Sequence, residues 1–429
     1  MGFFDKLFKK NEKNEEKVAK PKAEPKPAPK AEAPKAAPAQ PKASTGNPGP
    51  YDFIIPPVAS PNDGKIPKDA ILPAADLGPL LPGAPAGGKI KLAVYWCAAC
   101  GGCDVSLLDT HERLLTIGDM ADIVMWPIAE DGKEKDIEAM DDGEITVSII
   151  SGAVRNTENE HMAKLLRQKS KIVVAYGTCA AFGGSPALAN LVPGGAEEIL
   201  DYVYTKTPSS ASFQNEYHKD APQIPQEKTQ VPEGELTIPT LYDTVKTLDQ
   251  VIDVDYTVPG CPPLPESISQ LLKAVADFVY NGVPLPPKGT VVGTTTKTLC
   301  EECPRQKTGA RITELKEPFQ VDIDPNACLM EQGILCLGPA TMGGCGARCT
   351  RVGQPCRGCY GPSPDVQEQG ASIFTAVASL FPILDEDPTC GEDEIIRIMS
   401  SIKDPLGYFY AYTLGKSLIK RAVVEKGGN

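Results

Sequence analysis

The chain contains 429 residues, carries a formal net charge of −13, and has 14 cysteines but only three histidines. This length suits about two or three domains with a sizeable core. The negative charge argues against nucleic acid as the main partner, because phosphate binding needs clustered lysine and arginine. Three histidines are also too few for a histidine-rich metal site.

Residues 1–50 are predicted to be a disordered, low-complexity tail. The first 18 residues combine phenylalanines with lysines, so they could form a helix that touches a membrane surface or a partner. We favour the alternative of a solvated, partly ordered terminus. Residues 19–50 are rich in Lys, Pro and Ala, and such proline density prevents helix formation. Residues 1–45 hold eleven lysines and six acidic residues, so the rest of the chain carries a net charge of −18.

The N-terminal sequence also bears on location. It contains no apolar signal region, cleavage site or twin-arginine pair. The sequence has no apolar run long enough to span a bilayer. We therefore expect a cytoplasmic protein, whose thiols stay reduced and bind metals rather than form disulfides.

The next residues predict an α/β domain. Residues 51–88, rich in Pro and Gly, are expected to form a strap on the surface. Residues 89–292 alternate short β-branched runs with helical stretches, which predicts a doubly wound parallel sheet. The expected strands are 89–96, 145–152, 171–177 and 251–258, and the expected helices are 156–170 and 266–282. The polar, Pro-rich residues 205–245 are predicted to be an inserted surface loop.

Residues 293–429 are predicted to form a second, irregular domain. Regular periodicity fades there while cysteine and glycine dominate. Metal binding is expected to supply much of its stability. The aromatic and basic residues after Asp404 are expected to form a closing C-terminal helix.

One set of four cysteines follows the predicted strands. Its members lie in CAACGGCD (97–104), YGTCAAFGG (176–184) and VPGCPP (258–263), and they are Cys100, Cys103, Cys179 and Cys261. Ligands of open parallel sheets collect outside the carboxyl ends of the strands, so these thiols should meet at one rim. Four thiolates are what one cubane iron–sulfur cluster needs. Cys97 either replaces Cys100 as a ligand or is a small buried side chain, and we favour the second.

Eight further cysteines are clustered in the second half of the chain. They are Cys300, Cys303, Cys328 and Cys336, followed by Cys345, Cys349, Cys356 and Cys359. A zinc ribbon is the structural alternative, because paired C-x-x-C elements also hold zinc. The repeated Cys-Pro, Pro-Cys and Cys-Gly neighbours favour bulky cubane clusters. Cys390 lies outside all these motifs and is expected to be a bystander thiol.

The order and flanks of these cysteines resemble the small subunit of NiFe hydrogenases, within the flavodoxin-like family that includes the 20 kDa subunit of NADH:ubiquinone oxidoreductase. The sequence is most similar to the cytoplasmic methyl-viologen-reducing type associated with heterodisulfide reductase. The resemblance covers about four-fifths of the chain, from Lys89 onward. The motifs that carry it are YGTCAAFGG, VIDVDYTVPGCPP, CLGPAT and CRGCYGP.

This resemblance implies three 4Fe-4S clusters. Cys100, Cys103, Cys179 and Cys261 would hold the proximal cluster, nearest the NiFe centre of a separate large subunit. The distal cluster would be held by Cys300, Cys303, Cys328 and Cys336, and the medial one by Cys345, Cys349, Cys356 and Cys359. Many relatives have histidine where Cys300 stands and proline where Cys349 stands, so cysteine at both positions favours three cubanes.

Two departures from the family pattern are visible. Many relatives carry glutamate where this chain has Val105. Asp104 or Glu112 could take over a proton-path role, but we interpret each as a surface or interface carboxylate. The N-terminal tail and residues 205–245 have no counterpart in the family.

The sequence therefore predicts an oxidoreductase subunit that relays electrons from hydrogen oxidation in a NiFe large subunit to another redox subunit, linked to heterodisulfide reductase. One alternative is a sulfhydrogenase-type small subunit that feeds a flavin and NADP partner. A complex I-like subunit is disfavoured, because it usually keeps only the first cysteine set. The remaining alternative is a zinc-stabilised scaffold protein.

Overall fold

The structure is a computed structural model that describes residues 71–72, 88–111, 113–210, 224–382 and 391–419. The predicted tail, its N-terminal helix, most of the strap, Glu112 and Cys390 therefore lie outside the described residues. Within the described part of the chain, no helix is both long and apolar enough to cross a bilayer.

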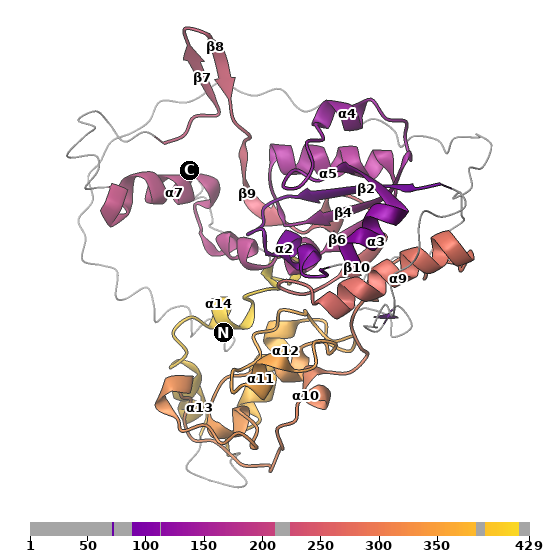
Figure 1. Cartoon of the computed structure of the whole chain (residues 1–429). Coiled ribbons are helices and arrows are strands. Elements are labelled where there is room, and N and C mark those ends of the chain that lie inside the picture. Colours follow the sequence, from indigo (N-terminus) through magenta and orange to yellow (C-terminus); the bar gives the residue numbers. More distant parts are fainter. Residues whose placement is uncertain (1–70, 73–87, 112, 211–223, 383–390, 420–429) are drawn as a thin grey trace. The chain divides into compact units, whose positions relative to one another are not determined.

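A sheet of seven parallel strands forms the centre of the first half of the chain (Figure 1). Its spatial order is β1-β11-β10-β6-β4-β2-β3. The strands are β1 (Ile71–Leu72), β2 (Ile90–Trp96), β3 (Ala121–Met125), β4 (Ile145–Ser151), β6 (Ser170–Tyr176), β10 (Tyr256–Val258) and β11 (Thr290–Val292). From β3 to β10 the order is that of flavodoxin-like folds, with the topological switch between β2 and β4. The α/β prediction is confirmed.

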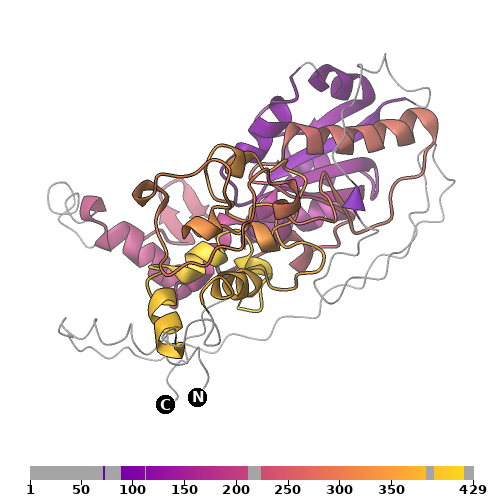
Figure 2. The same cartoon turned by 90° about the horizontal axis from the view of Figure 1, so that it is seen from below.

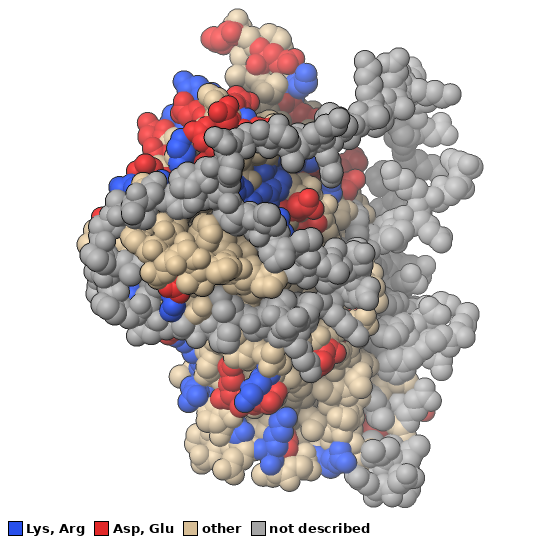
Figure 3. All heavy atoms as spheres, turned by 90° about the vertical axis from the view of Figure 1, so that its right-hand side faces the viewer, with Lys and Arg blue, Asp and Glu red and all other residues tan. Residues whose placement is uncertain are grey.

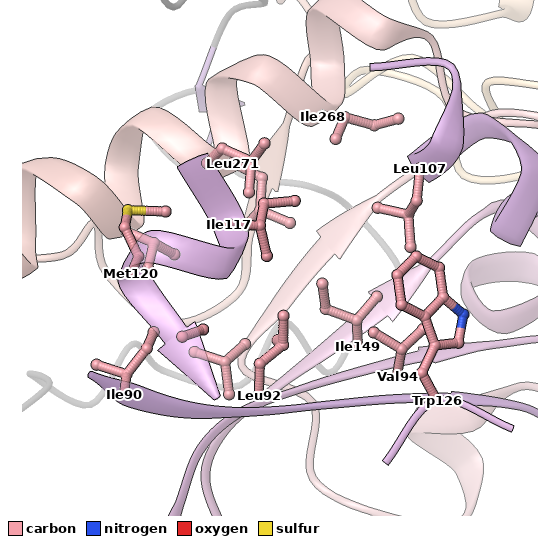
Figure 4. A pocket seen from close by; sticks show the side chains of 14 residues that line it. Ile90, Leu92, Val94, Leu107, Ile117, Met120, Trp126, Ile149, Ile268 and Leu271 are labelled. Atoms are coloured by element: carbon pink, nitrogen blue, oxygen red, sulfur yellow. The ribbon is translucent and has the colours of Figure 1, made fainter. Parts of the chain in front are cut away.

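Helices cover both faces of this sheet. On one face α5 (Thr157–Lys169) packs Met162 and Leu166 against a core that includes Ile150. On the other face α9 (Pro265–Asn281) and α3 (Arg113–Met120) cover the adjacent Ile149, around an apolar pocket (Figure 4). Successive strand residues point to opposite faces, so Ile149 and Ile150 anchor the two layers. The predicted helices 156–170 and 266–282 correspond to α5 and α9.

The predicted surface loop at 205–245 is wrong for much of its length. Strand β9 (Leu241–Lys246) pairs antiparallel with β5 (Val154–Asn156), and Val245 is buried. The Asn190 side chain fixes β9 by donating to the Val245 carbonyl at 3.0 Å and accepting from its N–H at 2.8 Å. Strands β7 (Lys228–Val231) and β8 (Gly234–Thr237) form an exposed hairpin. Polar, exposed strands lack the apolar run that would have revealed them.

Two other expectations differ in detail. The strand expected at 251–258 is formed only by its last three residues, β10, because η4 (Leu248–Gln250) and a turn precede it. The expected C-terminal helix is the short α14 (Pro405–Phe409), followed by the turn η8 (Leu414–Lys416). The rest of that segment, from 420, is outside the described residues.

The cysteine-rich region, orange to yellow in Figure 2, contains short helices joined by loops, as predicted. Its helices are α10 (Leu299–Glu302), α11 (Arg348–Arg351), α12 (Gln369–Ala378), α13 (Glu392–Met399) and α14. Its buried Leu329, Ile373 and Phe381 belong to one apolar cluster with Ala187 and Val245 of the first half. The boundary near 292 therefore crosses a continuous core, and the division into domains stays a prediction.

Charged side chains are mixed on the face drawn in Figure 3. Acidic and basic residues are interspersed there, and the described residues on that face form no extended basic patch. This distribution agrees with the acidic charge of the body.

Candidate metal centres

The first cysteine set lies at the carboxyl ends of three strands. Cys100 and Cys103 follow β2, and Cys103 is in α2 (Gly102–Leu108). Cys179 is in α6 (Thr178–Phe182) directly after β6, and Cys261 follows β10. Burial, and then the nearby thiols of Cys179, Cys261 and Cys100, raise the pKa of Cys103. The structure therefore brings together all four members predicted from the sequence.

Glycines let the backbone approach these sulfurs. At Gly177 (φ +83°), an added Cβ would lie 2.4 Å from the Cys103 Sγ. At Gly184 (φ +55°), it would lie 2.5 Å from the Cys179 Sγ. Both positive φ values are in the range that favours glycine. The loops are thus shaped around the thiols, and any larger residue would displace them.

Asp104 is buried next to this set, so its interpretation as a surface carboxylate is wrong. It is 3% exposed, because it lies on the inner side of α2, where its Oδ1 accepts the Trp126 Nε1–H at 3.0 Å. Its Oδ2 has no hydrogen-bond partner, and burial raises its pKa. Val105, the next residue, is 54% exposed.

The second set, Cys300, Cys303, Cys328 and Cys336, lines one cavity together with Arg305 and Lys307. Burial raises the pKa of Cys300 to about 12; Lys307 opposes this shift, and the other three thiols add to it. An added Cβ at Gly338 would lie 3.1 Å from the Cys300 Sγ, so this site also depends on close backbone approach.

The third set is Cys345, Cys349, Cys356 and Cys359. Burial, followed by Cys345, Cys261 and Cys349, raises the pKa of Cys359 to about 12. Backbone amides point at these sulfurs, since the Gly358 N–H donates to the Cys356 Sγ at 3.4 Å. Such N–H donors are the usual partners of cluster sulfurs.

The third set lies between the other two. Cys359 neighbours Cys261 of the first set and accepts a hydrogen bond from its backbone. On the other side, the Cys356 N–H donates to the Cys336 Sγ of the second set at 3.2 Å. The spatial order is therefore first, third, second, which differs from the order along the chain.

Cys97 stands apart from these sets. It is 9% exposed, belongs to the apolar core beside α5, and its Sγ lies 3.9 Å from the Asn159 carbonyl oxygen. This position agrees with a small buried side chain.

The donor groups fit iron–sulfur clusters. Each set offers four soft thiolates, and every cysteine in the described ranges is free. A structural zinc ion would accept the same four donors. Sequence reasoning missed the charged residues between the sets, Glu302, Arg305 and Lys307, although their spacing within CEECPRQK was visible.

Comparisons with known proteins identify the family. Residues 100–275 match the family described as NADH ubiquinone oxidoreductase, 20 Kd subunit. The iron-sulfur subunit of the F420-non-reducing hydrogenase of Archaeoglobus profundus is 39% identical, over 78% of this chain and 99% of that protein. Its namesake in Methanothermobacter marburgensis is 35% identical, over 79% and 99%. The sulfhydrogenase 2 subunit delta of Pyrococcus furiosus is 25% identical, over 68% and 94%. The chain therefore belongs to the family of hydrogenase small subunits found in the F420-non-reducing hydrogenases, and it is an oxidoreductase subunit.

Proposed function

We propose that this chain relays electrons through three 4Fe-4S clusters in a cytoplasmic NiFe hydrogenase. The first cysteine set would hold the proximal cluster, the third the medial cluster and the second the distal cluster. Each cluster, when bound, accepts and releases one electron. The observation that carries the proposal is the position of the third set between the other two, through the Cys261–Cys359 and Cys336–Cys356 contacts.

The surface beside the first set supports docking of a large subunit that holds the NiFe centre. Trp96, Val105 and Leu108 are large apolar residues, respectively 39%, 54% and 42% exposed. An added Cβ at Gly101, next to Cys100, would be 3.5 Å from the Trp96 ring, so this patch adjoins the set. Exposed apolar patches commonly mark protein interfaces.

The chain's own residues would fix the relay rather than perform chemistry. The Thr178 hydroxyl donates to the Cys359 carbonyl oxygen and accepts the Gly260 N–H at 3.0 Å. Thr178 therefore ties the loops of Cys179 and Cys261 to the third set. Buried cysteines also keep water from the thiolates, which helps to set the cluster potentials.

The electron acceptor is proposed to be a redox subunit linked to heterodisulfide reductase. The similarity to the sulfhydrogenase 2 subunit delta supports the alternative of a flavin and NADP partner, at lower identity. A zinc-stabilised scaffold remains the alternative from another class, because its donors would be identical.

The test is anaerobic purification from the native cell with the tail intact. We expect a NiFe large subunit and a further redox subunit to copurify, with about twelve irons per chain. Cys261→Ser should lose about four irons, whereas Cys97→Ser, the matched control, should keep them all. A colourless protein that contains zinc, or one without a large subunit, would refute the proposal.

A further inference from the structure

Glu302 links the second cysteine set to the third. It lies in α10 between Cys300 and Cys303, and its side chain is partly buried. Its Oε1 accepts the Gly344 N–H at 2.7 Å, and its Oε2 accepts the Gly346 N–H at 3.0 Å. These two glycines flank Cys345, so a carboxylate is held against the third set.

Arg305 is a buried cation on the other side. It is 8% exposed, and its guanidinium donates only to backbone carbonyls. The acceptors are Thr350 at 2.7 Å, Asp324 at 2.6 Å and Ala327 at 3.0 Å. Among the described residues, Arg305 makes no ion pair. An unpaired buried charge is costly, so an anion is needed nearby.

The anion that fits is the thiolate set beside it. Arg305 and Lys307 line the same cavity as Cys300, Cys303, Cys328 and Cys336. The carboxylate of Glu331 offsets part of the charge of Lys307, because it binds the Thr308 and Gly309 amides next to it. Arg305 is therefore the main buried positive charge at this site.

Exposed cations also surround the third set, but water screens them. Arg348 pairs with Glu266 on the surface, and Arg351 is exposed. Arg357 is exposed too and stacks on the Tyr408 ring at 3.9 Å. Exposed charges act weakly through solvent, whereas buried charges act through a lower dielectric.

We infer that Glu302 and Arg305 give the relay a direction, by lowering the potential of the medial cluster and raising that of the distal cluster. This inference rests on the proposed function. Reduction adds one electron, so a nearby carboxylate disfavours it and a nearby guanidinium favours it. In the step considered, the medial cluster loses one electron and the distal cluster gains it, with no proton transferred. Both residues are positioning residues, since neither is a cluster ligand.

The test is an EPR-monitored redox titration of the purified complex, with signals assigned by their loss in Cys349→Ala and Cys300→Ala. Glu302→Gln should raise the medial potential, and Arg305→Gln should lower the distal one. Each change is expected to shift the one-electron equilibrium between the clusters on the order of tenfold, which corresponds to about 59 mV. Arg305→Lys should retain most of the distal potential, because it keeps the charge.

Controls separate charge from damage. Glu301→Gln makes the same change one residue earlier, where the carboxylate is exposed and accepts the Thr298 N–H, and it should shift neither potential. If Arg305→Gln loses its cluster, the exposed Lys307→Gln should still lower the distal potential, by less. Unchanged or oppositely shifted potentials at full iron content would overturn this inference alone. A wild-type iron content far from about twelve would instead overturn the proposed function.

Discussion

Replacing Gly184 by alanine is expected to remove one cluster and leave the other two. Gly184 has φ +55° and ψ −159°, close to a region that is essentially restricted to glycine. The new Cβ would lie 2.5 Å from the Cys179 Sγ and 2.9 Å from the Cys179 Cα. Rotation of the thiol cannot relieve the second contact, so the backbone at Cys179 must move.

The cost can be worked from this geometry. Backbone strain contributes about 1–3 kcal/mol, and the forced displacement of packed atoms contributes about 1–3 kcal/mol more. The matched control is Gly282→Ala, at the end of α9. It also has positive φ, +63°, but an added Cβ meets nothing within 4 Å. The control should therefore cost only about 1–2 kcal/mol of strain.

The assay is iron content per chain, together with the melting temperature of the anaerobically purified complex. Gly184→Ala should hold about eight irons instead of about twelve and melt below the control. Gly282→Ala should keep its full iron content. If Gly184→Ala retains all its iron and melts with the control, the assignment of Cys179 as a ligand in a tightly fitted loop is refuted.

Single features of the structure give three more predictions. Cys97→Ala should keep all its iron and lose about 1 kcal/mol of stability, because it removes one buried sulfur; an iron loss would make Cys97 a ligand. Asp104→Asn should raise the melting temperature at pH 7, by about 1 kcal/mol of stability, because it removes a buried carboxylate with an unpartnered oxygen. Burial raises the pKa of Asp104, so the wild type gains stability as the pH falls through that pKa, and the two melting curves should converge in acid. A gap that widens in acid would contradict this sign. Replacing the hairpin at 228–237 by a short Gly-Ser linker should change stability by less than about 0.5 kcal/mol and leave the iron content intact, since its side chains are almost all exposed. A loss of iron would show that the hairpin supports the cysteine loops.

The sheet and the membership of the three cysteine sets could be predicted without a structure. Strands β2, β4 and β6 are buried β-branched and aliphatic runs, and such a local pattern is visible in the residues alone. The shared rim of Cys103, Cys179 and Cys261 also followed, because parallel strands end at one edge of a sheet. Strands β7 to β9 did not follow, since exposed polar strands have no distinctive hydrophobic period.

The spatial order of the sets, and the charges that lie between them, depend on the packing of the folded chain. Cys359 meets Cys261, and the Cys356 amide meets Cys336, through contacts that join loops far apart in the chain. The burial of Asp104 and Arg305 likewise depends on neighbours from other elements. Such contacts arise from the packing of loops, and residue spacing along a chain carries no information about which loops will touch.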